Sequence, residues 1–272
     1  MTETDTVQNT PTPRTRESLA HDLKTLGLQA GMTAIVHSSL SALGWVSGGS
    51  IAVVQALMDV LTLDGTLVMP THSGDYSDPS QWHYPPVPED WWPIIRATMP
   101  AFDPAIAPTR SMGRIVETFR TWPNVKRSSH PQVSFAAWGK HADFITADHS
   151  LDHSLGDRSP LARIYDLDGW VLLLGVPYGN NTSFHLGEYR AGKNRSMVQG
   201  GPIIEFGQRV WKEFNDIQWD ADRFDELGAD FEKADPIKIA RVGSAESRLF
   251  SQRSAVDFVQ EWFTEKSRDD LP

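Results

Sequence analysis

Cysteine is absent from the 272 residues of this chain. Its absence excludes a disulfide framework, a thiolate metal site and a cysteine nucleophile. No apolar run reaches the 18 or so residues of a membrane-spanning helix, and the first residues lack the apolar segment of a secretory signal. We therefore expect a cytoplasmic protein with no membrane partner. Residues 1–14 are expected to form a disordered tail and residues 15–272 a single domain.

The standard nucleotide and hydrolase motifs are also missing. The sequence contains neither G-x-x-x-x-G-K-[ST] nor G-x-G-x-x-G, so a P-loop or dinucleotide fold has no support. It contains no G-x-S-x-G, which argues against a serine hydrolase. A metal site could be drawn from His149, Asp152 and His153, or from His185 and Glu188. Neither group offers a full ligand set at a recognisable spacing, so we expect no metal.

Basic residues are scarce relative to acidic ones, and the formal net charge is −10. A general nucleic-acid binder needs a basic face, so nucleic acid is not an expected partner. The acidity fits a cationic ligand, although solubility alone is the commoner cause of such a charge. The charges are also segregated, with nine acids in residues 213–235 and a basic stretch in residues 110–127.

The N-terminal half alternates helix and strand signals. Apolar spacing predicts helices over Thr15–Leu26 and Ile51–Leu61, and strands over Thr33–Val36 and Thr66–Met69. Short connections between such elements are typical of a layered α/β fold with parallel strands. Residues 71–108 break this pattern. Such a long irregular stretch is either functional or an ordered surface excursion packed by its own aromatic residues.

The segment from Trp170 to Gly192 places a histidine where α/β folds carry out chemistry. An apolar run over Val171–Val176 predicts a buried strand, and a Gly/Asn-rich turn follows it. Thr182 is predicted to cap a helix over Ser183–Ala191. His185 would then lie in the first helical turn, just beyond the strand end.

His185 is a candidate general base. The partial positive charge of a helix N-terminus favours a neutral imidazole, which can accept a proton. A carboxylate normally orients such a base, and Asp216 and Glu188 are the first candidates. The alternative is a buried histidine that only packs in the core, which is the commoner role.

The basic stretch before a predicted helix at Gly113–Arg120 is a candidate phosphate site. Arg110 and Arg114 flank hydroxyl and glycine residues there, so guanidinium and backbone N–H groups could converge on phosphate oxygens. The alternative is a capped helix with a solvated basic face.

Six ordered motifs together resemble the aminoglycoside N3-acetyltransferase family, also called the antibiotic N-acetyltransferases. They are VHSSL at 36–40, DGTLVMP at 64–70, WPNVKRSSHP at 122–131, SPLAR at 159–163, LLLGV at 172–176 and NTSFHLGE at 181–188. The resemblance implies an α/β fold with a layered mixed sheet and flanking helices, distinct from the GNAT fold. It also implies acetyl transfer from acetyl-CoA to the 3-amino group of a 2-deoxystreptamine aminoglycoside, and hence antibiotic resistance.

The resemblance assigns roles to particular residues of this chain. It makes His185 the catalytic base and places its orienting carboxylate at Asp216, where some relatives carry glutamate. Thr182 or Ser39, with nearby backbone N–H groups, would donate to the oxyanion. The amine would attack the thioester directly, without an acyl-enzyme. Glu188 stays a second candidate carboxylate.

The same resemblance and the charge pattern imply two sets of binding residues, one for acetyl-CoA and one for the acceptor. The expected acetyl-CoA residues are His37, Ser38, Ser39, Arg110, Ser111, Met112, Gly113, Lys126, Arg127, Ser128 and His130. The expected acceptor residues are Asp75, Tyr76, Asp78, Glu213 and Asp220, because carboxylates attract a polycation. The protein is expected to be a monomer or a homodimer.

Two other functions stay open from the sequence. A member of the same family could acetylate a different amine. A non-catalytic protein could instead bind polyamines or other cations through its acidic segment, although such a binder needs neither the basic stretch nor the setting of His185.

Overall fold

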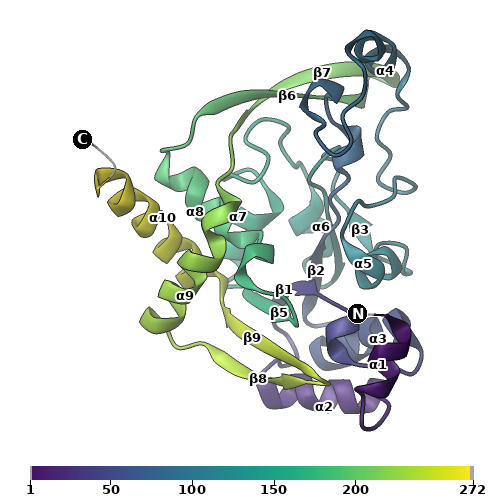
Figure 1. Cartoon of the computed structure of the whole chain (residues 1–272), viewed down its shortest axis with the longest axis vertical. Coiled ribbons are helices and arrows are strands. Elements are labelled where there is room, and N and C mark those ends of the chain that lie inside the picture. The colour runs from purple at the N-terminus through teal and green to yellow at the C-terminus, as the bar shows by residue number, and fades with distance from the viewer. Residues whose placement is uncertain (1, 270–272) are drawn as a thin grey trace.

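A seven-stranded mixed sheet forms the centre of the protein in a computed structural model that describes residues 2–269 (Figure 1). The strand order is β3-β4-β2-β1-β5-β9-β8. The bounds are β1 Thr33–Ser38, β2 Thr66–Pro70, β3 Lys126–Arg127, β4 Phe135–Gly139, β5 Trp170–Leu174, β8 Lys238–Val242 and β9 Ala245–Ser251. The expected α/β fold with a mixed sheet is confirmed.

The three central strands are parallel, and their neighbours are antiparallel. Ile35 of β1 lies between Val68 of β2 and Val171 of β5 in parallel register. Strands β4 and β9 pair antiparallel with β2 and β5. Since parallel strands end at the same edge of a sheet, the residues that follow β1, β2 and β5 lie near one another.

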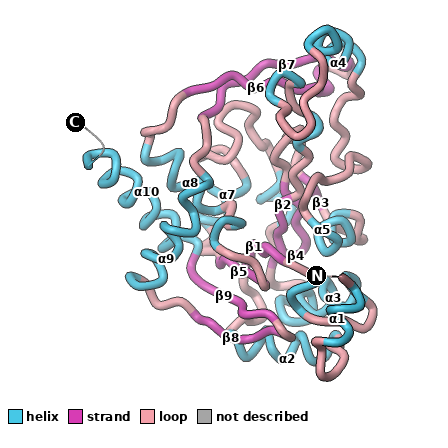
Figure 2. Tube along the Cα trace, viewed as in Figure 1, coloured by secondary structure: helices cyan, strands magenta, loops and turns pink. Residues whose placement is uncertain are grey.

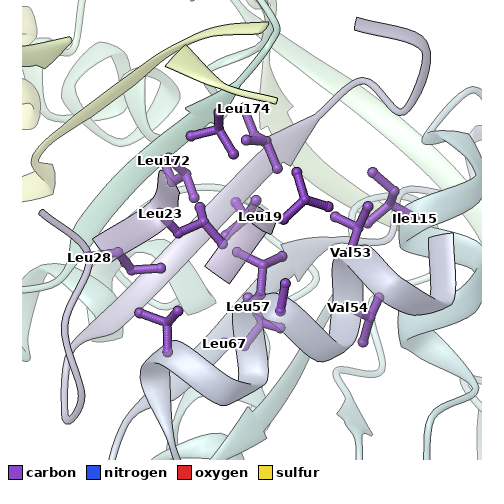
Figure 3. Packing of buried hydrophobic residues seen from close by; sticks show 14 of the residues in the cluster. Leu19, Leu23, Leu28, Val53, Val54, Leu57, Leu67, Ile115, Leu172 and Leu174 are labelled. Atoms are coloured by element: carbon purple, nitrogen blue, oxygen red, sulfur yellow. The ribbon is translucent and has the colours of Figure 1, made fainter. Parts of the chain in front are cut away.

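Helices cover both faces of the sheet, as the tube view also shows (Figure 2). On one face lie α2 (Arg16–Leu26), α3 (Gly49–Leu61) and α5 (Gly113–Arg120). Figure 3 shows this core, where Leu19, Leu57 and Leu172 come together. The other face carries α6 (Ala142–Thr146), α7 (Pro160–Asp166), α8 (Ser183–Ala191), α9 (Phe224–Ala234) and α10 (Gln252–Asp269).

Helix α8 has the predicted bounds and the predicted N-cap residue, but not the capping hydrogen bond expected from that residue. Thr182 has helical backbone angles, and its side chain makes no capping hydrogen bond. The Oδ1 atom of Asn181 instead accepts from the N–H of Ser183 at 3.2 Å. The helix ends at Gly192 in the left-handed conformation, as expected. Thr182 therefore occupies the predicted N-cap position, but its side chain does not cap the helix, because the helical backbone conformation already includes this residue.

The N-terminal residues differ from the expected disordered tail. Helix α1 (Glu3–Gln8) begins with a capping box between Thr2 and Asp5. Beyond it, the N–H of Arg14 donates to the carbonyl of Trp45 at 2.9 Å, and the N–H of Trp45 donates to Thr10 Oγ1 at 2.8 Å. Polar contacts hold the N-terminal segment in place, and its helix buries no residue. The amino-acid composition therefore did not indicate that the segment is ordered. Met1 and residues 270–272 of the expected tail and domain lie outside the described residues.

The irregular segment 71–108 is ordered and packs beside a separate hairpin. It contains the short helices η2 (Gly74–Tyr76), η3 (Pro79–Gln81), η4 (Glu89–Trp91) and α4 (Trp92–Thr98). The hairpin consists of β6 (Ser196–Glu205) and β7 (Gln208–Ile217), which pair only with each other. The N–H of Phe102 donates to the carbonyl of Pro202 at 2.9 Å, which ties the two parts together.

None of the helices within residues 2–269 combines the length and apolar content required to cross a membrane.

Candidate active site

The ends of the three parallel strands supply the polar groups of the candidate site. Ser38 is the last residue of β1 and Ser39 follows it, His72 follows β2, and the turn after β5 leads into α8 with His185. The N–H of Arg110 donates to the carbonyl of His72 at 2.9 Å, so the basic loop before α5 is fastened to the same edge.

His185 is held by Glu188 on the same helix. Its Nδ1 atom lies 2.7 Å from Glu188 Oε2, at the i,i+3 spacing that places side chains on one helix face. The Glu188 side chain is fully buried, and its Oε1 accepts from Asn194 Nδ2 and from the N–H of Asp220, both at 2.6 Å. A carboxylate that accepts from Nδ1–H leaves Nε2 of the imidazole available to take a proton.

Asp216 does not make the expected contact with His185. Its carboxylate accepts hydrogen bonds from the hydroxyls of Ser154, at 2.6 Å, and Tyr189. The Tyr189 hydroxyl in turn accepts from Trp219 Nε1 at 3.0 Å, and the Trp219 ring centroid lies 5.2 Å from that of His185. Asp216 is therefore linked to His185 only through two other side chains. The placement of the direct partner at Asp216 is wrong, because the i,i+3 position on α8 is already occupied by Glu188.

A cavity of about 610 Å³ opens beside the strand ends. Five of the expected donor residues line it: Ser38, Ser39, Ser111, Met112 and Gly113. Arg114 also contributes to the wall, and so do Glu3 and Thr6 of α1, which the sequence did not predict. The cavity thus joins the end of β1 to the basic turn before α5.

The other expected donor residues do not line this cavity. Arg127 donates to the carbonyls of Thr71 and Ala107 at 2.8 and 2.5 Å, which fixes its guanidinium in the fold. Ser128 and His130 are buried beside His149. Lys126 lies 3.4 Å from Asp143 in an exposed ion pair. The structure therefore does not bring Lys126, Arg127, Ser128 and His130 into the wall of the cavity that the other expected donor residues line.

A second cavity, of about 380 Å³, adjoins the first. Ser111 belongs to the walls of both. The remaining wall consists of His72, Gly74, Ser77, Gln81, Arg110, Gln132, Val133, Gln199 and Trp219. Because Trp219 also packs on His185, the His185–Glu188 pair lies next to the smaller cavity. Sequence reasoning missed His72, Gln199 and Trp219, which come together only through tertiary structure.

Two of the four expected acceptor carboxylates form ion pairs within the protein. Asp75 forms an ion pair with Arg110, and Asp78 lies 2.7 Å from Arg96. Tyr76 packs edge-on against Phe102 with a centroid distance of 5.4 Å.

Two further expected acceptor residues lie on or beyond β7. Glu213 is exposed on that strand. Asp220 lies beside Glu188, and burial raises the pKa of its carboxyl. Of the five expected acceptor residues, none is in the wall of the smaller cavity.

Several buried histidines make the fold sensitive to acid. Burial lowers the pKa of His37 to about 3 and that of His149 to about 4, from 6.5. In the unfolded chain these groups bind protons below about pH 6.5, whereas in the folded protein they do not. Their contribution to stability is therefore fully present above that pH and falls as the pH drops toward the folded values.

We expect the free energy of unfolding measured in urea to fall clearly between about pH 7 and about pH 5, with a limiting slope of roughly 1.4 kcal/mol per pH unit for each such histidine, and the urea midpoint to fall with it. Unfolding curves followed by circular dichroism would measure it, with His149→Gln expected to flatten the dependence. A midpoint that rises as the pH falls would contradict these assignments.

Within residues 2–269, no group of three or more His, Cys, Asp or Glu side chains is arranged to hold a metal ion.

Comparison with known proteins identifies the family. The family described as aminoglycoside 3-N-acetyltransferase matches residues 35–264. The SPbeta prophage-derived aminoglycoside N(3')-acetyltransferase-like protein YokD of Bacillus subtilis is 51% identical over 258 residues, which cover 94% of this chain and 95% of YokD. The crystal structure of YokD superposes with a TM-score of 0.97 at 49% identity, covering 98% and 100% of the two chains.

Two more distant structures were determined with ligands. AAC-IIIb, as a binary complex with CoASH, has a TM-score of 0.84 at 28% identity and covers 94% of this chain and 98% of its own. AAC-VIa bound to sisomicin has a TM-score of 0.85 at 29% identity, with coverage of 94% and 99%. The match over most of the sequence, together with the shared fold, shows that this chain belongs to the aminoglycoside 3-N-acetyltransferase family of acyltransferases.

Proposed function

We propose that this chain transfers an acetyl group from acetyl-CoA to the 3-amino group of a 2-deoxystreptamine aminoglycoside. The observation that carries this proposal is the His185–Glu188 pair beside two adjoining cavities. Such a product would no longer act as the parent antibiotic, so the activity would confer resistance. We place the reaction in the cytoplasm, and a monomer or a homodimer would suffice for it.

The larger cavity is assigned to the donor. It has room for an extended ligand, and its wall includes Ser38, Ser39 and the turn at Ser111–Gly113, where backbone N–H groups and Arg114 can meet phosphates. A relative with the same fold binds CoASH, which supports this assignment. The smaller cavity is assigned to the acceptor, and the sisomicin complex of another relative supports an aminoglycoside there.

The chemistry then follows from His185. The acceptor reacts as its neutral amine, and Nε2 removes a proton from the attacking nitrogen, while Glu188 stabilises the imidazolium through Nδ1–H. The amine nitrogen bonds to the thioester carbonyl carbon, and the carbonyl electron pair moves to oxygen. Collapse of this intermediate breaks the C–S bond, and the imidazolium returns a proton to the departing thiolate. No acyl-enzyme forms.

The oxyanion of this intermediate needs hydrogen-bond donors. Thr182 and Ser39, with neighbouring backbone N–H groups, are the candidates, and one good donor contributes about 3 kcal/mol of barrier lowering. Ser39 lines the larger cavity, and Thr182 lies three residues before His185. Both therefore come from elements that border the site.

Release of free thiol from acetyl-CoA tests the proposal. We expect release with gentamicin or kanamycin, and none with acetyl-CoA alone. Release with spermidine but not with either antibiotic would assign the chain to a different amine. Binding of spermidine without any thiol release would favour the non-catalytic cation binder and would overturn the proposal.

A further inference from the structure

Two side chains in the wall of the smaller cavity carry polar atoms that the fold leaves unsatisfied. His72 Nε2 and Gln199 Oε1 are covered from solvent and have no hydrogen-bond partner among the described residues. Both residues line this cavity. Buried polar groups in native proteins are nearly always hydrogen-bonded, so two such atoms around one cavity require an explanation.

The two residues come from separate parts of the fold that are held in place. His72 follows β2 of the central sheet, and Gln199 lies on β6 of the hairpin. The neighbours of Gln199 are anchored: the carbonyl of Val198 accepts from Gln81 Nε2 at 3.1 Å, and that of Gly200 accepts from Gln132 Nε2 at 2.9 Å. The amide of Gln199 is thereby kept at the cavity wall, and its own Nε2 reaches only Met197 Sδ, a weak acceptor, at 3.6 Å.

The charges in the wall of the smaller cavity indicate which chemical group of a ligand could bind to His72 and Gln199. The described residues that line the cavity include no carboxylate, and Arg110 is already paired with Asp75. Burial, together with the nearby His185, lowers the pKa of His72 to about 3, so its imidazole is neutral at physiological pH. An ammonium group would find no opposite charge here. A hydroxyl both donates and accepts, which suits an imidazole and an amide oxygen together.

We propose that His72 and Gln199 form a subsite that binds a hydroxyl group of the acceptor, next to the amine presented to His185. This inference rests on the proposed function, and it explains how the chain selects a hydroxyl-bearing amino sugar or aminocyclitol over a linear polyamine. The two residues position the acceptor and take no part in proton transfer.

Steady-state kinetics of His72→Phe and Gln199→Met test the subsite with kanamycin as acceptor. Each substitution keeps the approximate volume of the side chain and removes its hydrogen bond to the ligand. We expect the KM for kanamycin to rise about tenfold in each variant, because a lost hydrogen bond costs about that factor. The kcat and the KM for acetyl-CoA should change less than about threefold. His21→Phe and Gln208→Met, at exposed positions, serve as matched controls.

Calorimetric titration with kanamycin gives a second readout that does not depend on turnover. The same variants, shown to be folded by thermal melting, should bind kanamycin about tenfold more weakly than the unchanged protein. Unchanged kanamycin affinity in both variants would overturn the subsite and leave the proposed function intact. A rise in the KM for acetyl-CoA instead would also overturn it, since the cavity would then belong to the donor. Failure of the unchanged protein to bind or acetylate kanamycin would overturn the proposed function and the subsite together.

Discussion

The substitution His185→Ala is expected to lower kcat by at least about 100-fold, and by up to about 10,000-fold, which is the usual contribution of a general base. The methyl group cannot accept the proton of the acceptor amine, and no other imidazole touches Glu188 in the described structure. Binding of CoA should persist, because His185 is not among the described residues of the larger cavity.

Thiol release measures the loss of kcat, and calorimetry measures the retained affinity for CoA. His21→Ala is the matched control, since His21 is exposed on α2. A near-normal kcat in His185→Ala would show that His185 is not the general base. Loss of CoA binding in a folded variant would show that His185 serves the donor cavity.

The second large effect is expected from Glu188→Gln. The amide is nearly isosteric with the carboxylate, but it is neutral and can present an N–H to Nδ1, so it neither stabilises the imidazolium nor fixes the required tautomer. Comparable changes in a Ser-His-Asp triad cost about 10,000-fold, and we expect a fall in kcat of about 100-fold to 10,000-fold here. The full burial of Glu188 and its hydrogen bonds to Asn194 and Asp220 add a cost in stability, which thermal melting would separate from the kinetic effect.

The matched comparison is Asp216→Asn. Asp216 reaches His185 only through Tyr189 and Trp219, so we expect its kcat to fall by less than about tenfold. Thiol-release kinetics of Glu188→Gln and Asp216→Asn under identical conditions show which carboxylate contributes more to kcat. A larger loss in Asp216→Asn than in Glu188→Gln would reverse the assignment made from the geometry.

Local sequence patterns predicted the strand and the helix that position His185. Helices α2, α5 and α8 begin and end within a residue of their predicted bounds, because caps, glycine stops and apolar spacing are all local signals. Strand β8 was missed, since most of Lys238–Val242 is exposed or half-buried and its residues do not alternate between apolar and polar. Helix α1 was missed because it has no buried residue and begins with a capping box between Thr2 and Asp5 that carries no apolar pattern.

The candidate site could be predicted only as far as its parts are close in sequence. His185 and Glu188 lie three residues apart on one helix, so periodicity alone can pair them. Asp216 lies on a hairpin whose position relative to α8 depends on tertiary packing. Its separation of 31 residues from His185 in the sequence therefore does not predict how far apart the two side chains lie. Trp219, His72 and Gln199 are brought to one cavity by three different elements, and no local pattern connects them.

We propose that the chain moves one acetyl group directly from acetyl-CoA to the 3-amino group of an aminoglycoside. The most direct measurement is the NMR spectrum of the product formed from acetyl-CoA and kanamycin by the unchanged protein, with His185→Ala as the blank. We expect a single acetyl group on the nitrogen at position 3 and unmodified antibiotic in the blank. Acetylation at another nitrogen, or equal product in the blank, would contradict it.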